Sequence, residues 1–229
     1  MFRTSLSVIE KLILFLVGAV LMAGFIFFYS SRPMYDWYVR EDHLAEWLTV
    51  AGLLLASIVC FRRFFTLFRR RRAWFLTVSF LLGLLLFVAA GEEISWGQRI
   101  LGIKSSEYFQ KNNAQGETNL HNLVVDGVKI NKLIFSTLLS IGLAVYLILI
   151  PILYNRNNKF RTFINRSGVP VARPYQSIGI ALVFAITSLL RDGKSPEILE
   201  CGAALIFFLI IAYPQNKYLF AEDYSIKNT

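Results

Sequence analysis

Six blocks rich in apolar residues constrain the fold of this chain more than any other feature of its sequence. An α-helix rises 1.5 Å per residue, so about 20 apolar residues cross a hydrocarbon core roughly 30 Å thick. The mean hydropathy is +0.52 and 55% of the residues are hydrophobic, which lies outside the range of soluble globular chains. The blocks therefore predict membrane-spanning helices, at residues 8–29, 44–61, 73–90, 133–154, 175–190 and 198–213.

The predicted fold is all-α: a polytopic transmembrane helical bundle of about six spans, forming one integral membrane domain over residues 1–229. The last two blocks are short, so we expect them to be tilted, partly buried or paired as a hairpin. The first block is too long for a signal peptide and no small-residue cleavage site follows it, so we expect a retained anchor. Residues 91–132 form a long external loop whose apolar segments suit short interfacial helices.

Positively charged residues gather on one side of the predicted spans. With the Arg62–Arg72 loop in the cytoplasm, that side holds fifteen basic and three acidic residues, whereas the other side holds nine basic and twelve acidic residues. Lysine and arginine near the ends of spans stay in the cytoplasm. We therefore expect both termini to be cytoplasmic.

This sorting also explains the net charge of +9 without nucleic acid, because no motif that reads bases accompanies it. The Arg69–Arg72 run is flanked by Phe65, Phe68 and Trp74, a combination that suits anionic headgroups. We expect membrane lipids as the partner of the Arg62–Arg72 loop. A membrane protein partner or a second copy of this chain stays open.

The two cysteines exclude one kind of cross-link. Cys60 falls at the inner end of the second block and Cys201 at the outer start of the sixth, about a bilayer apart. A disulfide needs Cα atoms within about 7 Å, so we expect two free thiols. With only two histidines, a structural zinc site of Cys and His is not expected.

The acidic residues concentrate on the predicted external face, in segments 41–47, 91–99 and 113–122. The block from Trp47 to Phe61 holds about 15 residues, short of the roughly 20 that a span needs, so we expect its helix to include Glu46. The last block likewise draws in Glu200 and Glu197, which share a helical face. Ionisable groups at that depth are functional by default, with hydrated helix ends as the alternative.

Glu92 and Glu93 close the third block, directly before a segment with Trp96, Ile100 and Ile103 that suits the membrane interface. If this segment covers the two carboxylates, they are partly shielded from water and one can act as a general acid. The alternative is a solvated helix end.

Glu117 and His121 are four residues apart, so on a helix they lie one above the other and can share a metal ion or a proton. A hydrogen-bonded loop histidine is the alternative. The sequence alone identifies no metal and no cofactor.

The segments EDHLAEWLT, GEEISWGQR and QGETNLHN make the chain resemble a family of uncharacterised bacterial polytopic membrane proteins. The resemblance covers most of residues 41–135. It implies a bacterial cytoplasmic (inner) membrane protein with several spans, and it implies no reaction.

Three hypotheses follow for the function. The first is an enzyme at the external membrane face that acts on a lipid or lipid-linked substrate by acid/base or metal-assisted chemistry. The second is a non-catalytic partner or assembly subunit that docks another protein or a glycan, and the third is an ion-coupled transporter. The candidate catalytic residues are Glu46, Glu92, Glu93, His121 and Glu200, and the candidate substrate-binding residues are Trp96, Gln98, Arg99, Glu117, Asn119, Asn122 and Glu197.

Overall fold

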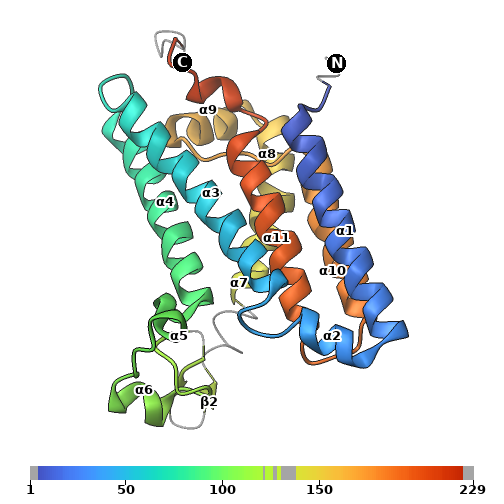
Figure 1. Cartoon of the computed structure of the whole chain (residues 1–229). Coiled ribbons are helices and arrows are strands. Elements are labelled where there is room, and N and C mark those ends of the chain that lie inside the picture. Colours follow the sequence, from blue (N-terminus) through green and yellow to red (C-terminus); the bar gives the residue numbers. More distant parts are fainter. Residues whose placement is uncertain (1–4, 121, 126–127, 130–137, 224–229) are drawn as a thin grey trace.

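The computed structural model describes residues 5–120, 122–125, 128–129 and 138–223, and its main body is a bundle of long helices (Figure 1). Five helical segments are long and apolar enough to cross a membrane, which suggests a membrane protein and confirms the predicted helical fold. They are α1 (Val8–Ser30), α3 (Leu44–Leu67), α4 (Ala73–Glu93), the run Leu139–Arg156 and α11 (Ser195–Ala212).

The sixth expected span corresponds to a shorter apolar helix, α10 (Pro174–Leu189), which has 16 residues. At 1.5 Å per residue it is about 24 Å long, somewhat less than a hydrocarbon core. The first residues of the expected span 133–154 lie outside the described residues. Among the described residues, five helical segments are therefore candidate spans by length and composition, and α10 is an additional shorter apolar helix.

The run Leu139–Arg156 consists of α7 (Leu139–Ala144), a π-helical turn η3 (Val145–Leu149) and α8 (Ile150–Arg156). Pro151 lies two residues after the end of the π-helical turn. Proline has no N–H to donate to the preceding turn, and its ring crowds the carbonyl four residues earlier. A local change in helical register at this position is the expected response.

Short elements connect the long helices. At the end of the bundle away from the termini lie α2 (Arg32–Tyr38), the 3-10 turn η1 (Ser95–Gly97), α5 (Gln98–Leu101), α6 (Glu107–Asn112) and the strands β1 (Val124–Val125) and β2 (Val128–Lys129). The strands pair antiparallel, with Val124 opposite Lys129. At the end with the termini lie α9 (Asn158–Ser167) and the 3-10 turn η4 (Lys217–Phe220).

The centre of the core is α11, whose side chains Ile198, Leu205, Ile206 and Ile210 are at most 2% exposed. Helix α3 packs closely against it at Gly52, where a Cβ atom would lie 2.9 Å from the backbone carbon of Ala204. A larger residue at this position would push the two helices apart. This contact holds the beginnings of α3 and α11 side by side, and both beginnings carry glutamates.

At the end with the termini, α1 and α10 are joined by a buried polar network. Glu10 is 2% exposed, and its Oε1 accepts hydrogen bonds of 2.6 Å from both Arg173 and Tyr175. Its Oε2 accepts from the backbone N–H of Ser7, which caps α1. Because Ser7, Arg173 and Tyr175 all donate to Glu10, the network compensates the burial of its charge.

Candidate functional site

The site lies at the end of the bundle away from the termini, where two adjacent helices begin and a third ends (Figure 1). Glu46 lies in the first turn of α3, Glu93 is the last residue of α4, and Glu197 and Glu200 lie near the start of α11. Capping explains part of this placement, because Pro196 occupies the first turn of α11, where its missing N–H costs nothing. Helices α3, α4 and α11 thus bring carboxylates to the same end of the bundle.

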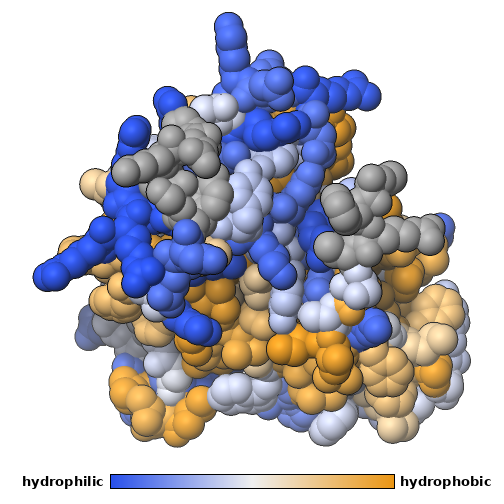
Figure 2. Space-filling model, turned by 90° about the horizontal axis from the view of Figure 1, so that it is seen from above, coloured by the Kyte–Doolittle hydropathy of each residue, from blue (hydrophilic) through white to orange (hydrophobic). Residues whose placement is uncertain are grey.

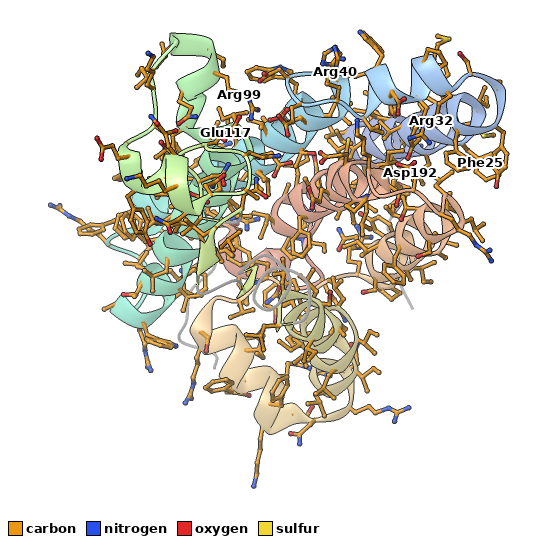
Figure 3. The ribbon with its side chains drawn as sticks, turned by 90° about the horizontal axis from the view of Figure 1, so that it is seen from below. Phe25, Arg32, Arg40, Arg99, Glu117 and Asp192 are labelled. Atoms are coloured by element: carbon orange, nitrogen blue, oxygen red, sulfur yellow. The ribbon has the colours of Figure 1, made fainter. Side chains whose placement is uncertain are left out.

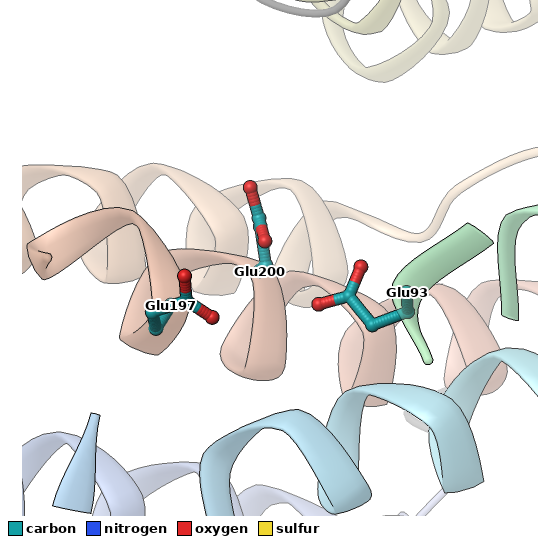
Figure 4. A group of neighbouring side chains, drawn as sticks. All are labelled: Glu93, Glu197 and Glu200. Atoms are coloured by element: carbon teal, nitrogen blue, oxygen red, sulfur yellow. The ribbon is translucent and has the colours of Figure 1, made fainter. Parts of the chain in front are cut away.

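Glu93, Glu197 and Glu200 form the carboxylate cluster of this protein. Each offers an oxygen atom, and these atoms lie within 4.8 Å of one another (Figure 4). Glu197 and Glu200 share one face of α11, and Glu93 approaches from α4. The side chains of Glu93 and Glu197 are half-buried, whereas Glu200 is exposed.

The separation of the cluster oxygens matches what a hard cation requires. Oxygen ligands sit about 2.0–2.6 Å from Mg²⁺ or Ca²⁺, so ligands on opposite sides of the ion are up to about 5 Å apart. Three ionised carboxylates this close repel one another unless a cation or shared protons compensate their charge. The cluster can therefore hold a divalent cation or exchange protons.

Glu46 belongs to a different arrangement, which is centred on Arg99 and which we call the Arg99 network. Arg99 donates to Glu46 at 2.5 Å, to Asp42 at 3.0 Å and to Glu117 at 2.8 Å, while Glu41 lies 3.8 Å away. Figure 3 shows Arg99 and Glu117 close together on the loop side of the bundle. The network ties the loop after α4 to the first turn of α3.

Charge balance in the Arg99 network favours the ionised arginine. Burial acts to lower the pKa of Arg99, but the hydrogen bond with Glu117 and the charges of Glu46, Glu117 and Asp42 together raise that pKa above its ordinary value. Glu46 is only 4% exposed and is paired with this cation. Its carboxylate is thus committed to the ion pair and is less available for chemistry than those of the carboxylate cluster.

Glu92 and Glu93 enter different sites although they are adjacent in sequence. The side chain of Glu92 is turned to the loop, where Oε1 accepts from the indole N–H of Trp96 at 2.9 Å and Oε2 accepts from the backbone N–H of Leu120. Successive residues on a helix point about 100° apart, since 3.6 residues make one turn. The two glutamates therefore do not form the pair that the sequence suggested: Glu92 holds the loop and Glu93 joins α11.

The turn that follows α4 is strained. Ser95, Trp96 and Gly97 all have positive φ angles, which glycine adopts freely and serine and tryptophan do not. The Ser95 hydroxyl donates to Glu117 and accepts from the side-chain amide of Asn119. These bonds hold the backbone in its strained form, so that the loop leaves α4 at a fixed angle.

Trp96 contacts Glu92, one of the two carboxylates that its segment was expected to cover, through its indole N–H. Its ring packs on Gly91, where a Cβ atom would lie 2.8 Å from the indole, and it contacts Phe87 on α4. Further along, Ile100, Leu101 and Ile103 are each at least 59% exposed. This exposed apolar segment still suits the membrane interface.

The predicted substrate-binding amides are used within the loop. Gln98 accepts from Thr118 N–H at 2.9 Å, Asn119 accepts from the Asn113 side chain at 2.8 Å, and Asn122 donates to Gln115. These bonds show a scaffold role for Gln98, Asn119 and Asn122 in this conformation.

The predicted metal pair consists of Glu117, which the structure describes, and His121. Glu117 lies in a bend rather than on a helix and accepts from Arg99, so the helical condition on which the pairing with His121 depended is not met at Glu117. His121 itself lies outside the described residues. Sequence reasoning did not identify Asp42 and Glu41 as partners of Arg99, although all three stand in the segments it selected.

Comparison with protein-family models, with curated proteins and with solved structures finds no match for this chain. The resemblance seen in the loop segments therefore stays an expectation. The function must be inferred from the residues of the site.

Proposed function

We propose that this protein is a multi-pass enzyme of the bacterial inner membrane whose carboxylate cluster acts on the polar part of a lipid or lipid-linked substrate. The observation that carries the proposal is the approach of Glu93, Glu197 and Glu200 from two separate helices to within 4.8 Å. Such convergence of like charges costs free energy and needs a compensating role. Structural scaffolding alone does not require it.

The charge distribution supports an external location for the cluster. The end with the termini carries most of the basic residues, so by the positive-inside rule we expect that end in the cytoplasm and the cluster on the other side. Glu200 is the sixth residue of α11, roughly 8 Å along its axis. A headgroup that is anchored in the outer leaflet reaches this depth without leaving the membrane.

The chemistry we propose is acid/base or metal-assisted. A protonated member of the cluster donates a proton to a leaving group, and an ionised member accepts one from an attacking hydroxyl or water. If a divalent cation is held, it polarises a phosphoryl or carbonyl oxygen of the substrate. Glu200, which is exposed, would face the substrate first, while the Arg99 network fixes the loop after α4 to the first turn of α3.

A second candidate is a non-catalytic subunit that docks another protein or a glycan. The observation that favours it is the exposed apolar segment Ile100–Ile103, held on a loop whose amides bond internally. The transporter hypothesis has less support, because the carboxylates of the described spans gather at the ends of the bundle rather than near its middle.

The proposal is tested on full-length protein purified in mild detergent, by elemental analysis of metal content and mass spectrometry of retained lipid. We expect a stoichiometric divalent metal or one retained lipid in the wild type, and its loss in Glu93→Gln and Glu197→Gln. Glu107→Gln is the matched control, because Glu107 is exposed and lies in α6, outside the cluster.

Two outcomes would overturn the proposal. One is a wild-type protein that carries neither metal nor lipid, and the other is retention of both by the folded Glu93→Gln and Glu197→Gln variants. Either result favours the docking alternative. In that case bulky substitutions in the Ile100–Ile103 segment should disturb function more than isosteric changes in the cluster.

A further inference from the structure

The end of the bundle at which both termini lie carries a surface of exposed cations. Figure 2 shows hydrophilic residues gathered over this end, with hydrophobic residues around its lower rim. The exposed basic residues there include Arg69, Arg70, Arg72, Arg156, Lys159, Arg166 and Lys217. Of the described acidic residues at this end, Glu222 and Asp223 are exposed and Glu10 is buried in its own network. The surface is therefore strongly positive.

Helix α9 crosses this end at the edge of the bundle (Figures 1 and 3). It is a well-defined element, because the Asn157 side chain caps its first turn and Gly168 ends it in the left-handed conformation. Its inner face packs through Ile164, which is 4% exposed, and Ser167, also buried. The helix is thus fixed to the bundle on one side only.

The outer face of α9 presents Lys159, Phe163 and Arg166. These positions are spaced by four and three residues, so they share a helical face, and all three are exposed, Phe163 by 60%. Lys159 and Arg166 form no ion pair with any residue that the structure describes. By contrast, Arg161 on the same helix donates to the carbonyl oxygens of Tyr154 and Asn155 and fastens the α8–α9 corner.

Lys159 is not explained by the stability of the helix. It lies in the first turn of α9, where the partial positive charge of the helix end disfavours a cation. Phe163 is equally unexplained by packing, since most of its surface is exposed. Two cations that flank one aromatic ring on an interfacial helix match the headgroup and acyl-chain boundary of a bilayer.

We propose that the Lys159–Phe163–Arg166 face of α9 binds the headgroups of anionic phospholipids in the leaflet at this end of the bundle. The two cations contact lipid phosphates, and the ring of Phe163 enters the boundary with the acyl chains. Charge complementarity selects this occupant, because the neighbouring loop adds exposed cations at Arg69, Arg70 and Arg72. This site is separate from the carboxylate cluster and does not depend on the proposed function.

The test is a lipid titration of purified full-length protein in detergent, followed by native mass spectrometry. Phosphatidylglycerol and phosphatidylcholine are the two probes. Each basic residue near an anionic surface contributes about a fivefold factor in binding, so the double variant Lys159→Gln/Arg166→Gln should weaken phosphatidylglycerol binding about 25-fold. Phe163→Ala should weaken binding of both lipids, because it removes apolar contact rather than charge.

The matched control is Lys104→Gln/Lys111→Gln, which changes the net charge equally through two exposed lysines at the other end of the bundle. It should bind phosphatidylglycerol like the wild type. Equal binding of the two lipids by the wild type would overturn the inference. So would equal losses in the two double variants, or unchanged phosphatidylglycerol binding in Lys159→Gln/Arg166→Gln.

Discussion

Replacement of Arg99 by alanine isolates the contribution of the Arg99 network to the fold. The variant leaves Glu46, which is 4% exposed, without its 2.5 Å partner. Removal of one member of a buried ion pair costs about 3–5 kcal/mol, because the remaining charge is uncompensated. The side chain of Arg99 is itself 18% exposed, so water screens the pair and we expect a smaller loss of about 2 kcal/mol.

The assay is a double-mutant cycle of Arg99→Ala, Glu46→Gln and the combined variant, followed by thermal unfolding in detergent. For a domain of this size, about 2 kcal/mol lowers the melting temperature by about 4–8 °C. Glu46→Gln should restore part of the loss, because it removes the unpaired charge, and the coupling free energy should exceed about 1 kcal/mol. If the loss in the combined variant equals the sum of the losses in the two single variants, the ion pair is not the cause of the destabilisation.

Three further predictions concern the framework. Gly52→Ala should destabilise the protein by about 1–3 kcal/mol through contact with the backbone of α11, whereas Gly18→Ala, with open space around its Cβ position, should be neutral or stabilising. Glu10→Ala should lower the melting temperature more than an alanine at an exposed glutamate, because it removes the buried acceptor shared by the partly buried donors of Arg173 and Tyr175. The hydrogen bond from the backbone N–H of Lys194 lowers the pKa of Asp192. The ionised Asp192 carboxylate therefore contributes stability above about pH 4, and this contribution is lost as the pH falls through the lowered pKa. Asp192→Asn should reduce that acid dependence in melting curves.

The helices could be predicted from the sequence because the length of an apolar block follows directly from bilayer thickness. The start of α3 at Leu44 could also be anticipated, since its apolar block alone was too short. The shorter length of α10 agrees with the short block from which it was predicted. By contrast, the π-helical turn before Pro151 depends on how the chain relieves one missing hydrogen bond.

From the sequence, only the depth of the site along the bundle could be predicted. Span lengths placed Glu46, Glu93 and Glu200 at a common depth, but depth does not determine which side chains meet. Glu93, and not Glu92, approaches the glutamates of α11, because the side chains of successive helical residues point in different directions. The partners of Arg99 depend on the path of a loop with three consecutive positive φ angles, which no periodic pattern encodes.

The most direct test of the central claim compares Glu92→Gln with Glu93→Gln in thermal unfolding of the purified protein in chelator. These neighbours have different surroundings, since Glu92 bonds to the loop and Glu93 lies in the carboxylate cluster. Both oxygens of Glu92 accept hydrogen bonds, one from the indole N–H of Trp96 and one from the backbone N–H of Leu120. A glutamine side chain has only one acceptor oxygen. In Glu92→Gln, one of these two N–H groups therefore faces the amide NH₂ group, which is itself a donor. We expect a loss of about 1–3 kcal/mol and a lower melting temperature.

Glu93→Gln should instead leave the melting temperature unchanged or raise it, because it removes one of three mutually repelling carboxylates. A higher or equal melting temperature for Glu93→Gln together with a lower one for Glu92→Gln is the predicted result. A loss for Glu93→Gln equal to or larger than that for Glu92→Gln would contradict the account. Glu93 would then be a structural residue, and the carboxylate cluster would no longer support a catalytic site.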